Sequence, residues 1–260
     1  MFGPLQQMNS KDLMLLTLMK IRMGCSHEDL AYRFGLSKAT VPRTLSTWIP
    51  LLALEFLIFI QPVTREQNKT CNPECFRPFG DNVVSILDCT EGQCERLSIA
   101  KAQAQTYSSY KNRNTWKKAI GIAPSGMINY ISQAYGGSSS DRYIVETSGY
   151  LDTLNEGDIV MMDKGFNISD LLIVRKVKLE IPPFLKNKGK FTSTLTSKTA
   201  LIARAGIHVE RAIARVKYFR LLQTPLPLSM IDMLDHIFII IEAITNLAPP
   251  LVNCRSHDNI

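Results

Sequence analysis

The chain has 260 residues, 45% of them apolar, and a formal net charge of +7 with an isoelectric point near 9.1. This apolar fraction is ordinary for a globular protein with a real core, and six cysteines in a chain of this length argue against a disulfide scaffold. The basic balance favours partners that carry phosphate. The opening MFGPLQQMNSKD lacks the features of a signal peptide, so we expect a soluble intracellular protein with reduced thiols.

Two apolar stretches have to be weighed as membrane spans. Residues 51–60 are too few to cross a bilayer and include Glu55, and residues 230–247 include Asp235 and Glu242. Acidic side chains are costly inside a membrane. We therefore predict that both stretches are buried helices and that the protein has no membrane partner.

Residues 1–58 are predicted to form a small all-α helix-turn-helix domain. Ser10 and Ser26 are placed to cap the first two helices, and an acidic residue three positions after Ser26 is typical of a capping box. Gly35 supplies the turn, and Ser37 is placed to cap the third helix. This order of elements is that of a DNA-binding helix-turn-helix, with an ordinary helical hairpin as the alternative.

The third helix is the one expected to enter the major groove. Lys38, Thr40 and Arg43 are predicted to face DNA there. Pro42 lies about five residues into this helix by sequence, where a proline removes a hydrogen bond, and we expect it to kink the helix.

The rest of the chain is predicted to be a mixed α/β domain. Residues 59–78 hold three prolines without periodicity and are predicted to be a linker. Residues 79–252 alternate short apolar strands with helices, including two strands joined by a turn at residues 124–126. Residues 253–260 form a tail.

Three acidic residues lie where they could form one site. Asp88 in SILDC and Asp163 in VMMDK are predicted to end strands, at the rim of a sheet where α/β folds place their sites. Glu210 lies beside the apolar stripe of a helix predicted over residues 198–221, and Lys217 follows it two turns later on the same side. That stripe consists of Val209, Ile213, Val216 and Phe219. Three carboxylates can hold Mg²⁺ for phosphoryl chemistry, whereas three unrelated surface acids are the alternative.

Two basic segments are candidates for contact with a DNA backbone. The segment YSSYKNRNTWKK interleaves basic and aromatic residues, which suits phosphates and stacked bases. A strand with one apolar face and one solvated basic face explains the same pattern equally well. The predicted DNA-binding residues of the two segments are Lys111, Arg113, Lys117, Lys118, Arg211, Arg215 and Lys217.

The cysteines and His208 are the other potential metal ligands. Cys71, Cys75, Cys89 and Cys94 have a C-x3-C and C-x4-C spacing, but Cys89 follows Asp88 on a strand, so their side chains point opposite ways. We expect no zinc site from these residues. His208 is expected to pack or to form a hydrogen bond rather than bind metal.

A series of motifs resembles one family. VVSILDCTE, TYSSYKNRNTWKKAIGIAPSG, YGGSSSD, DKGF, IPPFLKNKG and IHVERAIARVK occur in the order found in the DDE endonuclease domain of PIF/Harbinger transposases, over roughly residues 75–252. The amino-terminal block resembles the helix-turn-helix that often precedes this domain. The resemblance implies an RNase H-like mixed sheet flanked by helices, with Asp88, Asp163 and Glu210 as catalytic and metal-binding residues.

The resemblance also implies a reaction and partners. Two divalent ions, Mg²⁺ or Mn²⁺, would activate water to cleave a phosphodiester at a transposon end, and the freed 3′ hydroxyl could attack target DNA. Lys217 would touch a phosphate near the cut. Double-stranded DNA, a homo-oligomer on that DNA, a second DNA-binding protein and a nuclear location are the corresponding expectations.

Asp141 and several departures from the family pattern complicate this interpretation. Asp141 belongs to a family motif, but its place at a helix start favours a cap or a structural role, so Asp163 is predicted to be the second catalytic acid. Gly206 stands where relatives have arginine, and Gly92 stands where they have a bulky apolar residue. A catalytically inactive, domesticated transposase that only binds DNA is therefore the alternative.

Overall fold

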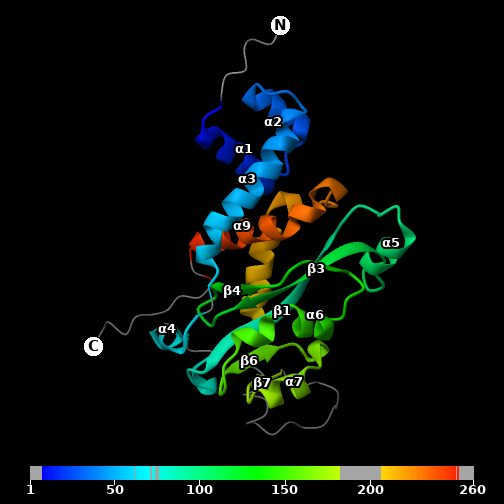
Figure 1. Ribbon diagram of the computed structural model, residues 1–260. Helices are drawn as coiled ribbons and strands as arrows, with labels where there is room; N and C mark the ends of the chain where they lie inside the picture. Colours follow the sequence, from blue (N-terminus) through cyan, green and yellow to red (C-terminus); the bar gives the residue numbers. More distant parts are fainter. Residues whose placement is uncertain are drawn as a thin grey trace.

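The structure is a computed structural model that describes residues 8–61, 63–70, 72–73, 76–181, 206–249 and 251. Three amino-terminal helices form one end of the molecule, and a sheet with helices on both of its faces forms the other (Figure 1). The motif IPPFLKNKG after Ile181 and the predicted start of the Glu210 helix lie in residues 182–205, outside the described residues.

The amino-terminal block consists of α1 (Ser10–Met23), α2 (His27–Phe34) and α3 (Thr40–Phe56). The cap of α1 is Asn9 and not Ser10, because the Asn9 side chain accepts a hydrogen bond from a first-turn backbone N–H. The cap predicted at Ser26 is confirmed. Gly35 has the predicted positive φ of 64° and lets the chain turn from α2 towards α3.

The prediction that Pro42 kinks the third helix is wrong. The helix begins at Thr40, so Pro42 lies in its first turn, where backbone N–H groups have no acceptor within the helix. Pro50 is the proline inside α3, and its missing N–H leaves the carbonyl of Ser46 without its usual helical donor. The helix nevertheless continues to Phe56.

The apolar stretch over residues 51–60, which covers the end of α3 and the following 3-10 turn η1 (Leu57–Phe59), is less buried than predicted. Leu52 and Ala53 are buried, but Leu51, Leu54 and Ile58 are exposed. By length and composition alone, Thr40–Phe59 is the one helix among the described residues that could span a membrane. The other apolar stretch is a core helix as predicted: α9 (Leu234–Leu247) buries most of its side chains.

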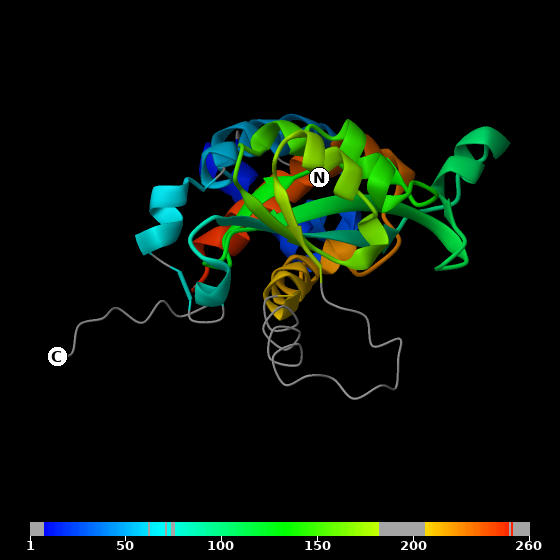
Figure 2. The ribbon, with the colours of Figure 1, turned by 90° about the horizontal axis from the view of Figure 1, so that it is seen from below.

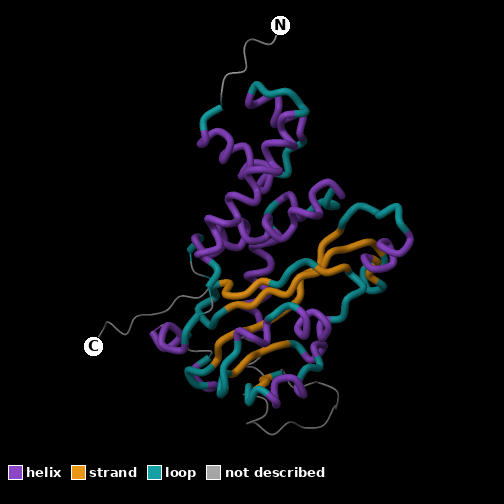
Figure 3. Tube along the Cα trace, viewed as in Figure 1, coloured by secondary structure: helices purple, strands orange, loops and turns teal. Residues whose placement is uncertain are grey.

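The sheet is mixed and has the order β2-β3-β1-β6-β7, with β4 and β5 also paired to β3 (Figure 3). Its strands are β1 (Val83–Gln93), β2 (Tyr107–Ser108), β3 (Arg113–Ile122), β4 (Ile128–Ile131), β5 (Tyr135–Gly136), β6 (Ile159–Met162) and β7 (Lys178–Glu180). The strand β3 is antiparallel to all of its partners, whereas β1, β6 and β7 are parallel to one another. This arrangement confirms the predicted mixed sheet of the RNase H-like class.

Helices cover the two faces of the sheet differently. Figure 2 shows α6 (Asp141–Thr147) and α7 (Ser169–Val174) on one face and the helix over residues 206–217 on the other. The four residues predicted to form the buried stripe of that helix are all buried. The shorter helical elements are η1 (Leu57–Phe59), α4 (Arg65–Thr70), η2 (Arg77–Phe79), α5 (Ala100–Thr106), η3 (Tyr150–Thr153), η4 (Lys164–Phe166), η5 (Arg220–Leu222) and η6 (Leu228–Met233).

One apolar core joins the amino-terminal block to the sheet. Leu16 of α1 and Ile49 of α3 belong to the same buried cluster as Phe238 of α9 and Ile86 of β1. The segment predicted as a linker is also attached to the sheet domain, since Asn68 donates a hydrogen bond to the Val83 carbonyl at 3.0 Å. The helix-turn-helix block is therefore packed against the α/β domain rather than tethered to it.

Gly92 is explained by its neighbour on the sheet. Gly92 lies directly opposite Trp116 in the antiparallel β1–β3 pair. A Cβ atom at position 92 would lie 2.0 Å from Cζ2 of the buried Trp116 ring. The ring of Trp116 thus packs across the glycine and fills the space of a side chain, so Gly92 does not indicate decay of the fold.

We expect Gly92→Val to lower the free energy of unfolding by about 1–3 kcal/mol, because the ring of Trp116 must move out of a packed core. Chemical denaturation monitored by tryptophan fluorescence would measure this. The neighbouring substitution Gln93→Val should cost about 0.5 kcal/mol or less. Equal effects of the two substitutions would contradict the steric explanation.

Glu242 is an acid inside the core. It is completely buried in α9, and neither carboxyl oxygen has a hydrogen-bond partner among the described residues. Burial raises the pKa of Glu242 well above its ordinary value of 4.5, while the nearby Lys118 ammonium acts in the opposite direction. The folded state therefore favours the protonated acid.

The raised pKa predicts that Glu242 destabilises the protein more at neutral than at acidic pH. As the pH rises above 4.5, the unfolded chain releases this proton before the folded chain does, so folding loses stability. We expect Glu242→Leu to stabilise the fold by about 1–3 kcal/mol near neutral pH and by less at about pH 4. Thermal melts at both pH values, with the exposed Glu156→Leu as control, would test this. Destabilisation at neutral pH would mean that Glu242 is ionised and paired with Lys118.

Candidate active site and nucleic-acid interface

The sheet places Asp88 and Asp163 side by side. In the parallel β1–β6 pair, Leu87 is in register with Met162, and the two aspartates are the next residues of their strands. Asp163 directly follows β6, which ends at Met162, one residue earlier than predicted. Asp88 does not end β1, because β3 continues to pair with β1 as far as Gln93.

Both aspartates are close to the helix that carries Glu210. Ile86 and Met161 belong to the apolar cluster beneath that helix, and Asp88 lies two residues beyond Ile86, on the same face of β1. The helix packs on this face through Val209 and its other buried residues, while Glu210 itself is exposed at the edge.

The electrostatics of Asp88 show which acids are near it. Burial raises the pKa of Asp88, and the charges of Asp141, Asp163 and Glu210 raise it further, while a hydrogen bond of 2.7 Å from the Cys89 backbone N–H lowers it. The structure thus brings the three predicted acids into one electrostatic neighbourhood. Within the described parts of the chain, no three potential ligands converge closely enough to hold a metal ion as they stand.

Asp141 is also near Asp88, but it is engaged differently. It forms an ion pair of 2.7 Å with Lys117 and interacts with the thiol of Cys89, whose side chain points to the face of β1 opposite Asp88. Burial raises the pKa of this thiol, and Asp141 raises it further. The cap of α6 is Ser140, so the role of Asp141 in the structure is that of an ion-pair partner rather than a cap.

The donors fit a hard divalent cation. Asp88, Asp163 and Glu210 supply only carboxylate oxygens, which suit Mg²⁺ or Mn²⁺ better than softer metals. Asp88 is half-buried beside like charges, an arrangement that a cation would relieve. His208 packs beside Phe76, with ring centroids 5.9 Å apart, in line with the packing role expected for it. Cys71 and Cys75 lie outside the described residues.

Comparison with known families identifies the superfamily of the chain. Residues 87–246 match the family described as DDE superfamily endonuclease, and this range holds all three acids. The chain belongs to the DDE superfamily of endonucleases. Residues 6–57 match the family described as the helix-turn-helix of DDE superfamily endonuclease, which implies DNA binding. No curated protein matches the chain.

The helix-turn-helix of this DDE endonuclease leaves two predicted DNA contacts exposed. Lys38 precedes α3 and forms a surface ion pair with Glu28, a type of interaction that contributes little and exchanges readily. Arg43 is exposed on α3. The hydroxyl groups of Thr40 and Ser37 form a hydrogen bond of 2.8 Å, so Thr40 helps to form the start of the helix.

The predictions for Lys118 and Lys117 need correction. Lys118 has a side chain only 1% exposed, because it lies between the sheet and α9, paired with Asp235 at 2.5 Å and above the ring of Phe238. It cannot reach DNA in this structure. Lys117 is ion-paired with Asp141, and its side chain is only 16% exposed. It therefore holds the edge of the site in place and is not free to contact DNA.

Four of the remaining predicted cations are exposed, and one is engaged elsewhere. The exposed residues are Lys111, Arg113, Arg211 and Lys217. Arg215 instead donates a hydrogen bond of 2.6 Å to the carbonyl of Pro249. Lys217 lies near the site: burial and the Lys111 charge lower its pKa, whereas the charges of Asp88 and Glu91 raise it.

Glu91 is a residue of the site that the sequence did not indicate. Its charge acts on Lys217, and its carboxylate accepts a hydrogen bond of 2.5 Å from the hydroxyl of Thr115. The available signal was its position three residues after Asp88 on the same strand. Strand alternation argues against it, since residues three apart face opposite sides of a flat strand.

We expect the double substitution Lys38→Ala and Arg43→Ala to weaken DNA binding and to reduce the slope of log affinity against log salt by about one per lost phosphate contact. Fluorescence anisotropy with duplex DNA over a salt series would measure the slope. Arg175→Ala with Lys176→Ala, at the opposite end of the molecule, is the matched control (Figure 1). An unchanged slope would indicate that the amino-terminal helices form an ordinary helical hairpin that does not bind DNA.

Proposed function

We propose that the protein is a transposase-derived, metal-dependent DNA endonuclease of the PIF/Harbinger type, which cleaves phosphodiester bonds at transposon ends. The observation that carries the proposal is that the charges of Asp141, Asp163 and Glu210 all act on the half-buried Asp88. These acids belong to a chain that also contains a helix-turn-helix packed into the same core.

Each residue of the site has a role in this proposal. Asp88, Asp163 and Glu210 would hold two Mg²⁺ or Mn²⁺ ions, which when bound provide a stronger water nucleophile and stabilise charge at phosphorus. Lys217 binds a DNA phosphate beside the cut. Asp141, through its ion pair with Lys117, holds the rim of the site next to Asp88.

Strand transfer, partners and location belong to the same proposal. After cleavage, a freed 3′ hydroxyl held in the same site attacks target DNA. The protein acts in the nucleus as a homo-oligomer on DNA, together with a second DNA-binding protein. The net charge of +7 supports a polyanionic partner.

The alternative is a catalytically inactive, domesticated transposase that acts as a nuclear DNA-binding protein. Gly206, where relatives have arginine, is the observation that favours it. Two other observations no longer support the inactive alternative. Gly92 makes room for Trp116, and Pro42 lies in the first turn of α3. Among the described residues, nothing lies within 4 Å of a Cβ added at position 206, so these neighbours would accept a side chain there.

Glu210→Gln separates the two functions. We expect it to abolish cleavage of terminal-repeat DNA in Mg²⁺ or Mn²⁺, because the neutral amide is a poorer metal ligand, while DNA binding and the melting temperature change little. Gel analysis of a labelled duplex would measure cleavage. Glu156→Gln, a change of the same kind at an exposed site, is the control.

Two results would contradict the catalytic proposal. Equal cleavage by wild type and Glu210→Gln would remove Glu210 from the site. If the wild type is inert with every divalent metal, Gly206→Arg is the next variant to test. The described residues around Gly206 leave room for this side chain. Recovery of activity would identify a nuclease disabled at one position, and continued inactivity would support the DNA-binding protein.

A further inference from the structure

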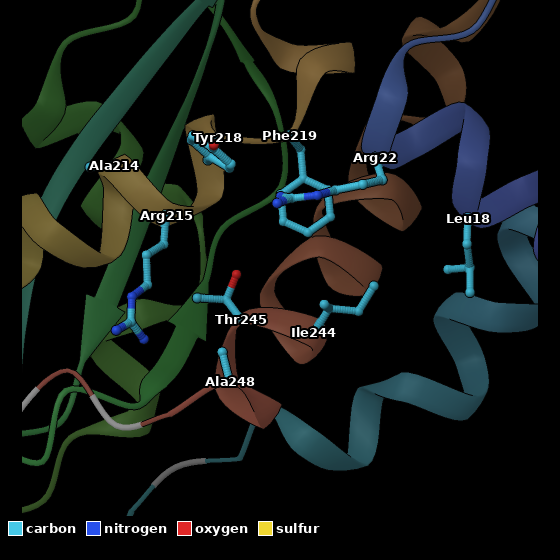
Figure 4. Close-up of a pocket in the computed structure, with 9 residues that line it drawn as sticks. All are labelled: Leu18, Arg22, Ala214, Arg215, Tyr218, Phe219, Ile244, Thr245 and Ala248. Carbon is cyan, nitrogen blue, oxygen red and sulfur yellow. The ribbon is translucent and has the colours of Figure 1, made fainter.

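An apolar groove of about 610 Å³ lies away from the acids, between α1, the helix over residues 206–217 and α9. Its surface is formed largely by Leu18, Ala214, Ile244 and Ala248. Figure 4 shows the guanidinium of Arg22 over the ring of Phe219 and Arg215 on the far side of Thr245 from it. The groove is therefore aliphatic in its centre and cationic at two points of its edge.

The two arginines are held in place without a carboxylate. The guanidinium of Arg22 lies 4.9 Å from the ring centroid of Tyr218 and 4.8 Å from that of Phe219. Arg215 donates to the Pro249 carbonyl. Neither arginine forms an ion pair with any residue that the structure describes. Two positioned positive charges thus face a groove that contains no compensating acid among the described residues.

We propose that this groove binds a partner protein through an amphipathic helix, with aliphatic side chains in the groove and carboxylates against Arg22 and Arg215. Apolar grooves of this kind accept the apolar face of a helix, and the flanking charges select an acidic one. Nucleic acid fits less well, because the aliphatic centre of the groove offers no donor to a phosphate. Phe219 is only 4% exposed under Arg22, which leaves Tyr218 as the one ring of this lining that a base could reach.

The position of the groove gives the bound helix contact with both functional parts of the chain. Leu18 and Arg22 belong to α1 of the helix-turn-helix block. Ala214 lies one turn beyond Glu210 on the same helix. A partner in this groove therefore rests on the DNA-binding block and on the helix of the active site. Binding requires no cleavage activity, so the proposal can be tested even if the endonuclease is inactive.

The probe is a fluorescein-labelled helical peptide of about 18 residues, with leucines along one face and glutamates on both sides of them. We expect saturable binding in fluorescence anisotropy. Ala214→Phe, which fills the groove, and Arg22→Gln, which removes one charge, should each weaken binding about tenfold. Ala104→Phe, at an exposed alanine of α5, should leave affinity unchanged. A peptide with lysines in place of the glutamates should also bind about tenfold more weakly.

Several outcomes would overturn the proposal. Failure of the wild-type chain to bind the acidic peptide would do so, as would equal binding of the lysine peptide. Displacement of the peptide by duplex DNA with the same sensitivity to Arg22→Gln would assign the groove to nucleic acid. Tighter peptide binding after deletion of residues 252–260 would assign it to the chain's own carboxyl terminus. Circular dichroism of each variant excludes loss of folding, and Arg22→Gln tests the groove independently if Ala214→Phe does not fold.

Discussion

The parallel pairing of β1 with β6 is the constraint on which the site depends. Leu87 and Met162 are in register at the last step of this ladder, so Asp88 and Asp163 leave it as neighbours. Both strands are buried on both faces by apolar side chains, which prevents the register from slipping. The geometry of two acids is therefore maintained by the core of the sheet rather than by contacts between the acids, which repel each other.

The surroundings of each lysine determine whether its charge is available to DNA. The same excess of basic residues serves three purposes: Lys118 is buried against Asp235, Lys117 is paired with Asp141, and Lys217 remains exposed near Asp88. A net charge of +7 consequently overstates the number of cations that can meet DNA. Only an exposed side chain can exchange its counterions for phosphate, because a buried pair would first have to be broken.

The continuity of the core links DNA binding to the active site. Residues of α1 and α3 share one apolar cluster with α9 and β1. The helix-turn-helix block therefore cannot move independently of the sheet without exposing that cluster. The groove beside Arg22 lies at this junction. A partner bound there contacts α1 and the helix that carries Glu210 at once.

The sequence by itself determined the elements whose periodicity and end signals are local. Gly35 marked a turn, Ser26 marked a cap, and the stripe from Val209 to Phe219 marked the buried face of a helix. The ordered motifs around Asp88, Asp163 and Glu210 were sufficient to identify the DDE endonuclease superfamily. Tertiary structure alone decided which cations are buried, that Gly92 accommodates Trp116, and that Glu91 lies near Lys217. These facts depend on strand register and on packing between segments far apart in the chain, and a local pattern carries no information about either.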